Sequence, residues 1–194
     1  ALVLKPHARH GERRGWRVTY LEPDGGGIIH AEQVGAALQA DTVLVSIMHV
    51  NNEIGVIQDI AAIAAACARH GGARLHVDAA QSVGKCTVDF AALGVDLMSL
   101  SAHKVYGPKG VGALLVAQSR GRPAVQLSAL QFGGGQERGL RAGTVPTHQV
   151  VGMGRAFELA MAPETEAQRI GTLRERLWRG LASIGGVLRN GDAV

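Results

Sequence analysis

Apolar residues follow two different spacings along this chain, and the two spacings alternate. Short runs rich in β-branched residues predict strands at 17–21, 42–48, 74–77, 96–100 and 111–116. Stretches in which apolar residues recur every three or four positions predict helices at 31–39, 58–70 and 146–182. Because strand and helix alternate, we expect an α/β fold with a mostly parallel sheet flanked by helices.

Turn-forming residues support this division of the chain. Glycine-containing turns at 24–27, 71–72 and 107–108 fall between the predicted elements rather than inside them. Cys67 lies on the apolar face of the helix expected at 58–70, so we predict a small core residue there. The end of the last expected helix has an apolar face formed by Leu173, Leu177 and Leu181.

Composition narrows the class of protein. The 194 residues are 46% hydrophobic and 19% charged, which is typical of a globular domain with a core. The net charge of +4 comes from scattered arginines with few aromatic residues, so direct nucleic-acid binding is not expected. No apolar run reaches the roughly 18 to 20 residues that span a bilayer. Two cysteines without C-x-x-C spacing favour a reducing compartment and predict no metal site.

Candidate chemistry lies where two predicted strands end. Asp78 ends one strand, and Lys104 follows the next strand along the chain. Open α/β sheets bind ligands at the carboxyl ends of their strands, so both side chains can face one crevice. Two interpretations remain open: a structural ion pair, or a lysine that binds pyridoxal phosphate (PLP) with a carboxylate at the pyridine nitrogen.

Neighbouring polar residues match the other needs of such a cofactor. Ser101 and His103 precede a glycine-rich turn that can approach a phosphate, and Gln81 can donate to the phenolic ring oxygen. Asn52 follows another strand and can bind a substrate carboxylate. The glycine-rich segment before Thr144 lacks the Gly-Lys-Ser/Thr ending of a nucleotide loop, so it indicates a turn instead.

Several motifs in order resemble one family of enzymes. The segments are SIMHVNNEIGVIQDI, HVDAAQSVGK, DLMSLSAHKVYGPKGVGAL, GGGQERGLRAGTVP and the closing NGD. Together, from about Val18 to Asp192, they resemble the class V aminotransferases, which are fold type I PLP enzymes. Within that family they resemble the cysteine desulfurases of the housekeeping and mitochondrial type, which serve iron-sulfur cluster assembly.

The resemblance implies roles for individual side chains. Lys104 would bind the aldehyde of PLP covalently and act as a catalytic base. The other implied roles belong to Asp78 at the pyridine nitrogen, Gln81 at the ring oxygen, Ser101 and His103 at the phosphate, Thr144 at the phosphate of the neighbouring subunit, and Asn52 at the substrate. A site shared in this way would make the protein a homodimer.

The implied reaction converts L-cysteine to L-alanine and leaves a persulfide on an enzyme cysteine. The sulfur would pass to an iron-sulfur scaffold and other acceptor proteins, and to tRNA thiolation, in the bacterial cytoplasm or the mitochondrial matrix. Alternatives are a selenocysteine lyase, an aminotransferase of the same class, or a catalytically silent scaffold or split-protein half.

The resemblance also implies a division into domains. Residues 1–186 would form the PLP-binding large domain without its N-terminal part, and residues 187–194 would begin a truncated C-terminal small domain. The family carries its persulfide cysteine and a substrate-binding arginine in that small domain, and neither Cys67 nor Cys86 occupies the place of that cysteine. We therefore expect this chain alone to be inactive as a desulfurase.

Overall fold

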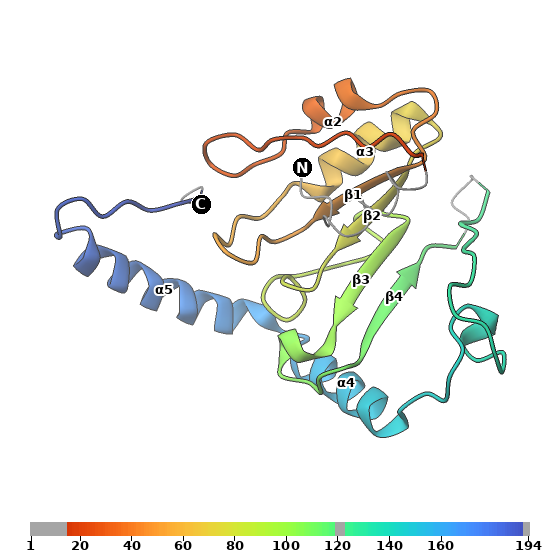
Figure 1. Cartoon of the computed structure of the whole chain (residues 1–194). Helices are drawn as coiled ribbons and strands as arrows, with labels where there is room; N and C mark the ends of the chain where they lie inside the picture. Colours follow the sequence, from red (N-terminus) through yellow and green to blue (C-terminus); the bar gives the residue numbers. More distant parts are fainter. Residues whose placement is uncertain (1–14, 119–122, 192–194) are drawn as a thin grey trace.

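A four-stranded sheet forms the centre of the molecule in the computed structural model, which describes residues 15–118 and 123–191. The strands are β1 (Leu44–Met48), β2 (Arg74–Asp78), β3 (Leu97–Ser101) and β4 (Gly112–Val116), and they lie in sequence order (Figure 1). β1, β2 and β3 are parallel, whereas β4 is antiparallel to β3. The expected α/β fold with a mostly parallel sheet is confirmed.

The strand expected at 17–21 was wrong. These residues have no strand conformation, and they are mostly exposed. Arg17 instead pairs with Asp41 at the surface, with 2.5 Å between the guanidinium and the carboxylate. An apolar alternation alone does not make a strand, because a strand also needs a neighbour for its backbone hydrogen bonds.

The described chain contains helices α2 (Ala31–Ala37), α3 (Ile60–His70), α4 (Thr147–Leu159) and α5 (Pro163–Leu181), and 3-10 turns η1 (Ala102–Val105) and η2 (Glu137–Gly139). The single helix expected at 146–182 is therefore two helices. Pro163 lacks a backbone N–H and fits the first turn of a helix but not its interior, so the chain ends one helix and begins another there.

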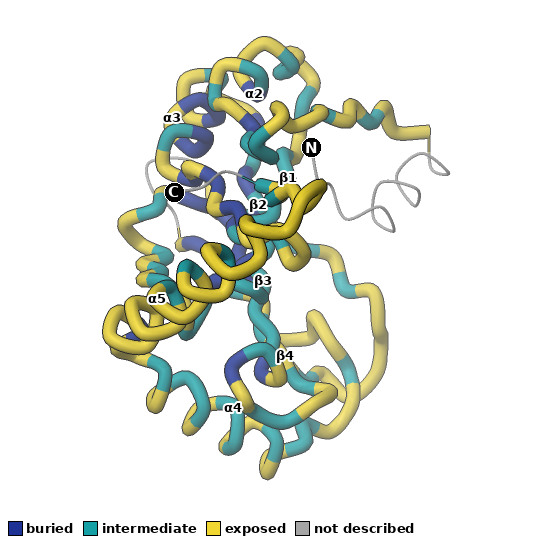
Figure 2. The backbone as a smooth tube through the Cα atoms, turned by 90° about the vertical axis from the view of Figure 1, so that its left-hand side faces the viewer, coloured by how far each residue is buried: buried dark blue, intermediate teal, exposed yellow. Residues whose placement is uncertain are grey.

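The core lies between the sheet and helices α2 and α3. Ile47, Val77 and Met98 come from the sheet and pack against Ile63 and Cys67 of α3. Cys67 is only 2% exposed, which confirms its prediction as a core residue. Figure 2 shows most of the buried residues gathered in this part of the molecule, while α5 is mostly exposed. Full burial of each large apolar side chain stabilises the fold by about 1.5–3 kcal/mol.

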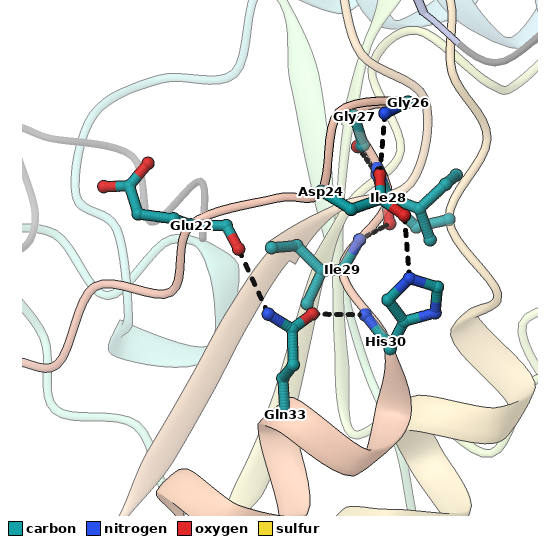
Figure 3. A network of polar contacts seen from close by, with 9 residues as sticks. Glu22, Asp24, Gly26, Gly27, Ile28, Ile29, His30 and Gln33 are labelled. Atoms are coloured by element: carbon teal, nitrogen blue, oxygen red, sulfur yellow. Dashed lines mark hydrogen bonds and ion pairs between the residues drawn. The ribbon is translucent and has the colours of Figure 1, made fainter.

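A polar network fixes the loop that leads into α2 (Figure 3). The Asp24 carboxylate accepts hydrogen bonds from the backbone N–H groups of Gly26 and Ile28, each at 2.9 Å, and its other oxygen lies 2.8 Å from His30 Nε2. These bonds lower the pKa of Asp24. Gln33 accepts from the His30 N–H and donates to the Glu22 carbonyl, so its side chain ties α2 to the loop that precedes it.

The segment 123–146 and helices α4 and α5 lie apart from the α2–α3 core. In Figure 1 the segment extends away from β4, α4 returns to the end of the sheet that carries η1, and α5 projects beyond it. The leucines at 173, 177 and 181 are exposed, although the amphipathic helix predicted there is present. Within the described ranges, every helix is too short or too polar to cross a membrane.

Candidate active site

The order of the strands brings three loops to one edge of the sheet. Because β1, β2 and β3 are adjacent and parallel, their carboxyl ends meet at the same edge. The turn after β1 carries Asn52, the turn after β2 carries Gln81, and η1 after β3 carries Lys104. The edge predicted from the sequence therefore gathers residues that are far apart in the chain.

Asp78 is held at the end of β2 from both sides. Its carbonyl accepts a hydrogen bond from His49 N–H at 2.9 Å, and the next residue, Ala79, donates its N–H to the Ser99 carbonyl at 3.0 Å. The half-buried carboxylate accepts from the Ala80 N–H at 3.0 Å. Val77 points to the core, so strand alternation directs Asp78 to the opposite face.

Lys104 lies in a short turn between buried residues. Its neighbours Ala102 and Val105 are buried, and Lys104 itself is half-buried. Tyr106 ends η1 in the left-handed conformation, with φ 63°, which turns the chain back. The Gly107 N–H then donates to the Ala102 carbonyl at 2.9 Å. The backbone that carries the lysine is thus fixed by its own turn.

Helix α4 supports this turn through small residues. A methyl group added at Gly152 would lie 2.8 Å from Pro108 Cγ, and one added at Gly107 would lie 3.1 Å from Ala156 Cβ. The Gln149 side chain donates to the Lys109 carbonyl at 3.0 Å. A larger residue on this face of α4 would push the Lys104 turn away.

Ser101 and His103 form a polar pair at the start of η1. The Ser101 hydroxyl lies 2.9 Å from His103 Nδ1, and His103 is exposed. Asn52 is also exposed, in the turn after β1. Thr144 is exposed on the segment between β4 and α4, outside the three loops that leave the edge of the parallel strands. The fold therefore gathers six of the seven predicted site residues and leaves Thr144 on another segment.

The structure also decides against one interpretation of Asp78 and Lys104. In residues 15–118 and 123–191, no ion pair joins these two side chains. A structural salt bridge between these two side chains is therefore not formed in the described part of the chain. The same described ranges contain no group of three or more His, Cys, Asp or Glu residues that could hold a metal ion.

Lys85 contacts a predicted site residue, and the sequence did not reveal this contact. Its ammonium donates to Gln81 Oε1 at 2.9 Å and to the Gln81 carbonyl at 3.3 Å. Partial desolvation lowers the pKa of Lys85, and the nearby charge of Lys104 lowers it further. The only sequence signal was the four-residue spacing from Gln81, and this spacing brings the two side chains together because residues 79–86 form consecutive hydrogen-bonded turns.

A polar row crosses the sheet face that carries Asp78. The Ser46 hydroxyl lies 2.8 Å from His76 Nδ1, and the Ser99 hydroxyl lies 3.2 Å from His76 Nε2. The sequence favoured His76 as a packed strand residue, and it is half-buried in β2. The alternation of side chains along each strand indicated which residues share a face of the sheet. Which of them lie beside one another depends on the strand register, and the sequence alone did not give that register.

The chain is similar in sequence to known proteins of one family. The family model described as "Aminotransferase class-V" matches residues 3–194. The cysteine desulfurase IscS of Aeromonas hydrophila is 59% identical over 185 residues, which are 95% of this chain and 45% of that protein. The chain thus spans about half the length of the curated relatives it matches.

Solved structures are also similar to this chain. A NifS-like protein has a TM-score of 0.89 and 36% identity, over 96% of this chain and 50% of that one. The structure titled "SspA in complex with cysteine" has a TM-score of 0.73 and 44% identity, over 86% of this chain and 48% of that one. These similarities confirm the resemblance that the sequence motifs indicated.

Proposed function

The chain belongs to the aminotransferase class-V family, and from this premise we propose that it forms the PLP site of a cysteine desulfurase. The observation that supports this most strongly is the meeting of the Asp78, Gln81 and Lys104 loops at one edge of the sheet. PLP enzymes need a lysine, a carboxylate and an anion-binding turn within one crevice. The chain supplies all three groups there.

The donor set fits the cofactor in charge and chemistry. Asp78 would face the pyridine nitrogen, where its negative charge would favour the protonated form of that nitrogen. Ser101 and His103 would bind the phosphate together with backbone N–H groups of the turn. Gln81 would donate to the ring oxygen. When bound, the cofactor supplies an acceptor for the electrons that are left when the substrate loses its α-proton.

The residues of this chain would then divide the remaining work. Lys104 would hold the cofactor covalently, and its amine, once released, would remove the α-proton of the substrate. Asn52 would bind the substrate carboxylate and orient the amino acid. The fixed backbone of η1 restricts the positions of the Lys104 amine. A catalytic group that is already oriented speeds the reaction, because less conformational entropy is lost in reaching the transition state.

We propose L-cysteine as the substrate because the curated relatives are named cysteine desulfurases and one structural neighbour is titled as a complex with cysteine. The reaction moves sulfur from cysteine to a thiol, and it yields alanine and a persulfide. Cys67 is buried, and burial raises the pKa of the Cys86 thiol, so neither favours a reactive thiolate. We therefore assign the acceptor thiol to a cysteine outside these 194 residues.

The wider organisation follows from the same family. We propose residues 1–186 as the large domain and residues 187–194 as the beginning of a small domain. Thr144 would bind the phosphate in the partner subunit of a homodimer, which suits its position on a separate segment. The sulfur would serve an iron-sulfur scaffold and other acceptors, without direct contact with nucleic acid or membrane. The bacterial relatives support a bacterial cytoplasm as the site of action.

Measurement of the reaction products distinguishes a cysteine desulfurase from an aminotransferase and a selenocysteine lyase. The full-length protein, loaded with PLP, is given L-cysteine and an excess of a small thiol, which accepts the sulfur and reduces it to sulfide, and alanine and sulfide are measured. Alanine and sulfide in equal amounts, lost in Lys104→Ala, are expected. Conversion of a keto acid to an amino acid in place of sulfide would identify an aminotransferase, and activity confined to selenocysteine would identify a selenocysteine lyase.

A further inference from the structure

The turn after β2 contains a lysine that contacts a proposed cofactor ligand. Lys85 donates to Gln81 twice, through the side-chain oxygen at 2.9 Å and through the carbonyl at 3.3 Å. An ammonium group has three N–H donors and no acceptor, whereas a glutamine amide has one donor end and one acceptor end. The contact with Lys85 is therefore compatible with only one orientation of the amide.

The contact determines which end of the Gln81 amide faces Lys85. The Gln81 oxygen faces Lys85, so the two N–H groups of Gln81 Nε2 remain for another partner. The reverse orientation would place these N–H groups against the ammonium, donor against donor. Without Lys85 both orientations would be open to the amide, since the two ends have nearly the same shape.

The backbone of this turn is fixed against the Lys104 turn. Ser82 is fully buried, and both its N–H and its hydroxyl donate to the Ala79 carbonyl, at 3.1 and 3.0 Å. Gly84 has φ +76°, and a methyl group added there would lie 2.9 Å from Val105 Cγ1. The two turns therefore pack directly together. The effect of the Lys104 charge on Lys85 agrees with this proximity.

We infer that Lys85 is a positioning residue that holds the Gln81 amide with its N–H groups available to an oxygen acceptor in the crevice. The identity of that acceptor as the phenolic oxygen of PLP rests on the proposed function. The orientation of the amide does not rest on it, because Lys85 and Gln81 are in contact in the chain itself. Lys85 acts only through Gln81 and need not touch the cofactor.

The first test uses the chain without cofactor. Nuclear magnetic resonance of the side-chain amide of Gln81, assigned by its loss in Gln81→Ala, reports the surroundings of these N–H groups directly. Lys85→Met should shift both resonances and speed their exchange with water, whereas Lys85→Arg keeps a donor and should restore them in part. Lys109→Met, at an exposed lysine beyond η1, should leave them unchanged. Unchanged Gln81 resonances in Lys85→Met would overturn the inference.

Addition of PLP separates this inference from the proposed function. In the unsubstituted chain the Gln81 resonances should move on binding, and Lys85→Met should bind PLP roughly 2- to 10-fold more weakly, as expected for one hydrogen bond. If PLP attaches to Lys104 while the Gln81 resonances stay in place, the role of Lys85 toward the cofactor is wrong. If PLP does not bind but Lys85→Met still disturbs Gln81, positioning stands and the proposed function fails.

Discussion

At the scale of single residues, the neighbours of Asp78 separate its structural role from its chemical one. From the described residues the carboxylate accepts one hydrogen bond, from the Ala80 N–H, and an amide oxygen can accept the same bond. Asp78→Asn should therefore cost less than about 1.5 kcal/mol of folding stability. It should nevertheless reduce alanine formation by the loaded enzyme by at least about 100-fold, because a neutral amide does not hold the pyridine nitrogen protonated.

Urea denaturation and the alanine assay, run side by side on Asp78→Asn and the unsubstituted protein, check this separation. Near-normal turnover by the variant would remove Asp78 from the chemistry. A loss of several kcal/mol in unfolding free energy would instead make it a structural residue.

His49 gives a prediction about acid stability. It is 6% exposed, and within the described chain its Nδ1 atom has no hydrogen-bond partner. Burial lowers the pKa of His49 below its usual value near 6.5. The unfolded chain therefore takes up this proton at higher pH than the folded chain does. The stability contributed by neutral His49 is complete above about pH 6.5 and is lost as pH falls below that value.

Unfolding free energies measured at several pH values between 7.5 and 5 check this effect. The unsubstituted chain should lose stability over this range more steeply than His49→Phe does. His148→Gln, at an exposed histidine on α4, serves as the control and should keep the steep slope. Equal slopes in His49→Phe and the unsubstituted chain would contradict the assignment to His49.

Among single residues, those at strand ends were predictable and those that act through another side chain were not. Asp78, Gln81 and Lys104 could be predicted because the carboxyl end of a parallel strand is a fixed place in an α/β sheet. Lys85 and the Ser46–His76 contact depend on turn geometry and strand register. Spacing in one sequence does not determine either.

At the scale of elements, α4 is the support of the Lys104 turn, and two of its glycines offer a matched test. A methyl group at Gly152 would lie 2.8 Å from the ring of Pro108, whereas one at Gly154 would meet no atom within 4 Å. Gly154→Ala should stabilise the helix by about 0.5–1 kcal/mol. Gly152→Ala should lose that gain and destabilise the chain by about 1–3 kcal/mol through overpacking.

Thermal melts of the two variants check the difference, and PLP titration shows whether the displaced turn also weakens binding at Lys104. Equal melting temperatures for Gly152→Ala and Gly154→Ala would mean that α4 does not press on this turn.

The same scale shows why some elements were predicted and others were not. Helix α3 was predicted well because Asp59, whose side chain accepts from the Ala62 N–H, and the left-handed Gly71 mark its two ends chemically. The break between α4 and α5 was missed because apolar spacing continues across it. Pro163 was the available signal, and its missing N–H was given too little weight.

At the scale of the whole molecule, the proposed homodimer predicts complementation between two defective chains. Lys104→Ala lacks the attachment point, and Thr144→Ala lacks the group proposed to reach the partner's phosphate. When equal amounts of the two variants exchange subunits at random in a two-fold dimer, about a quarter of all sites should be intact. PLP retention or alanine formation in the mixture measures them. No gain over the separate variants would contradict a site shared between subunits.

Covalent attachment of PLP is the most direct test of the account as a whole. The purified chain is incubated with PLP, reduced with borohydride and digested, and the lysine-containing peptides are examined by mass spectrometry. The account predicts a pyridoxyl group on the Lys104 peptide, absent in Lys104→Ala and with no comparable labelling of Lys85 or Lys109. Absence of any adduct, or labelling spread evenly over these lysines, would contradict a PLP site at this edge of the sheet.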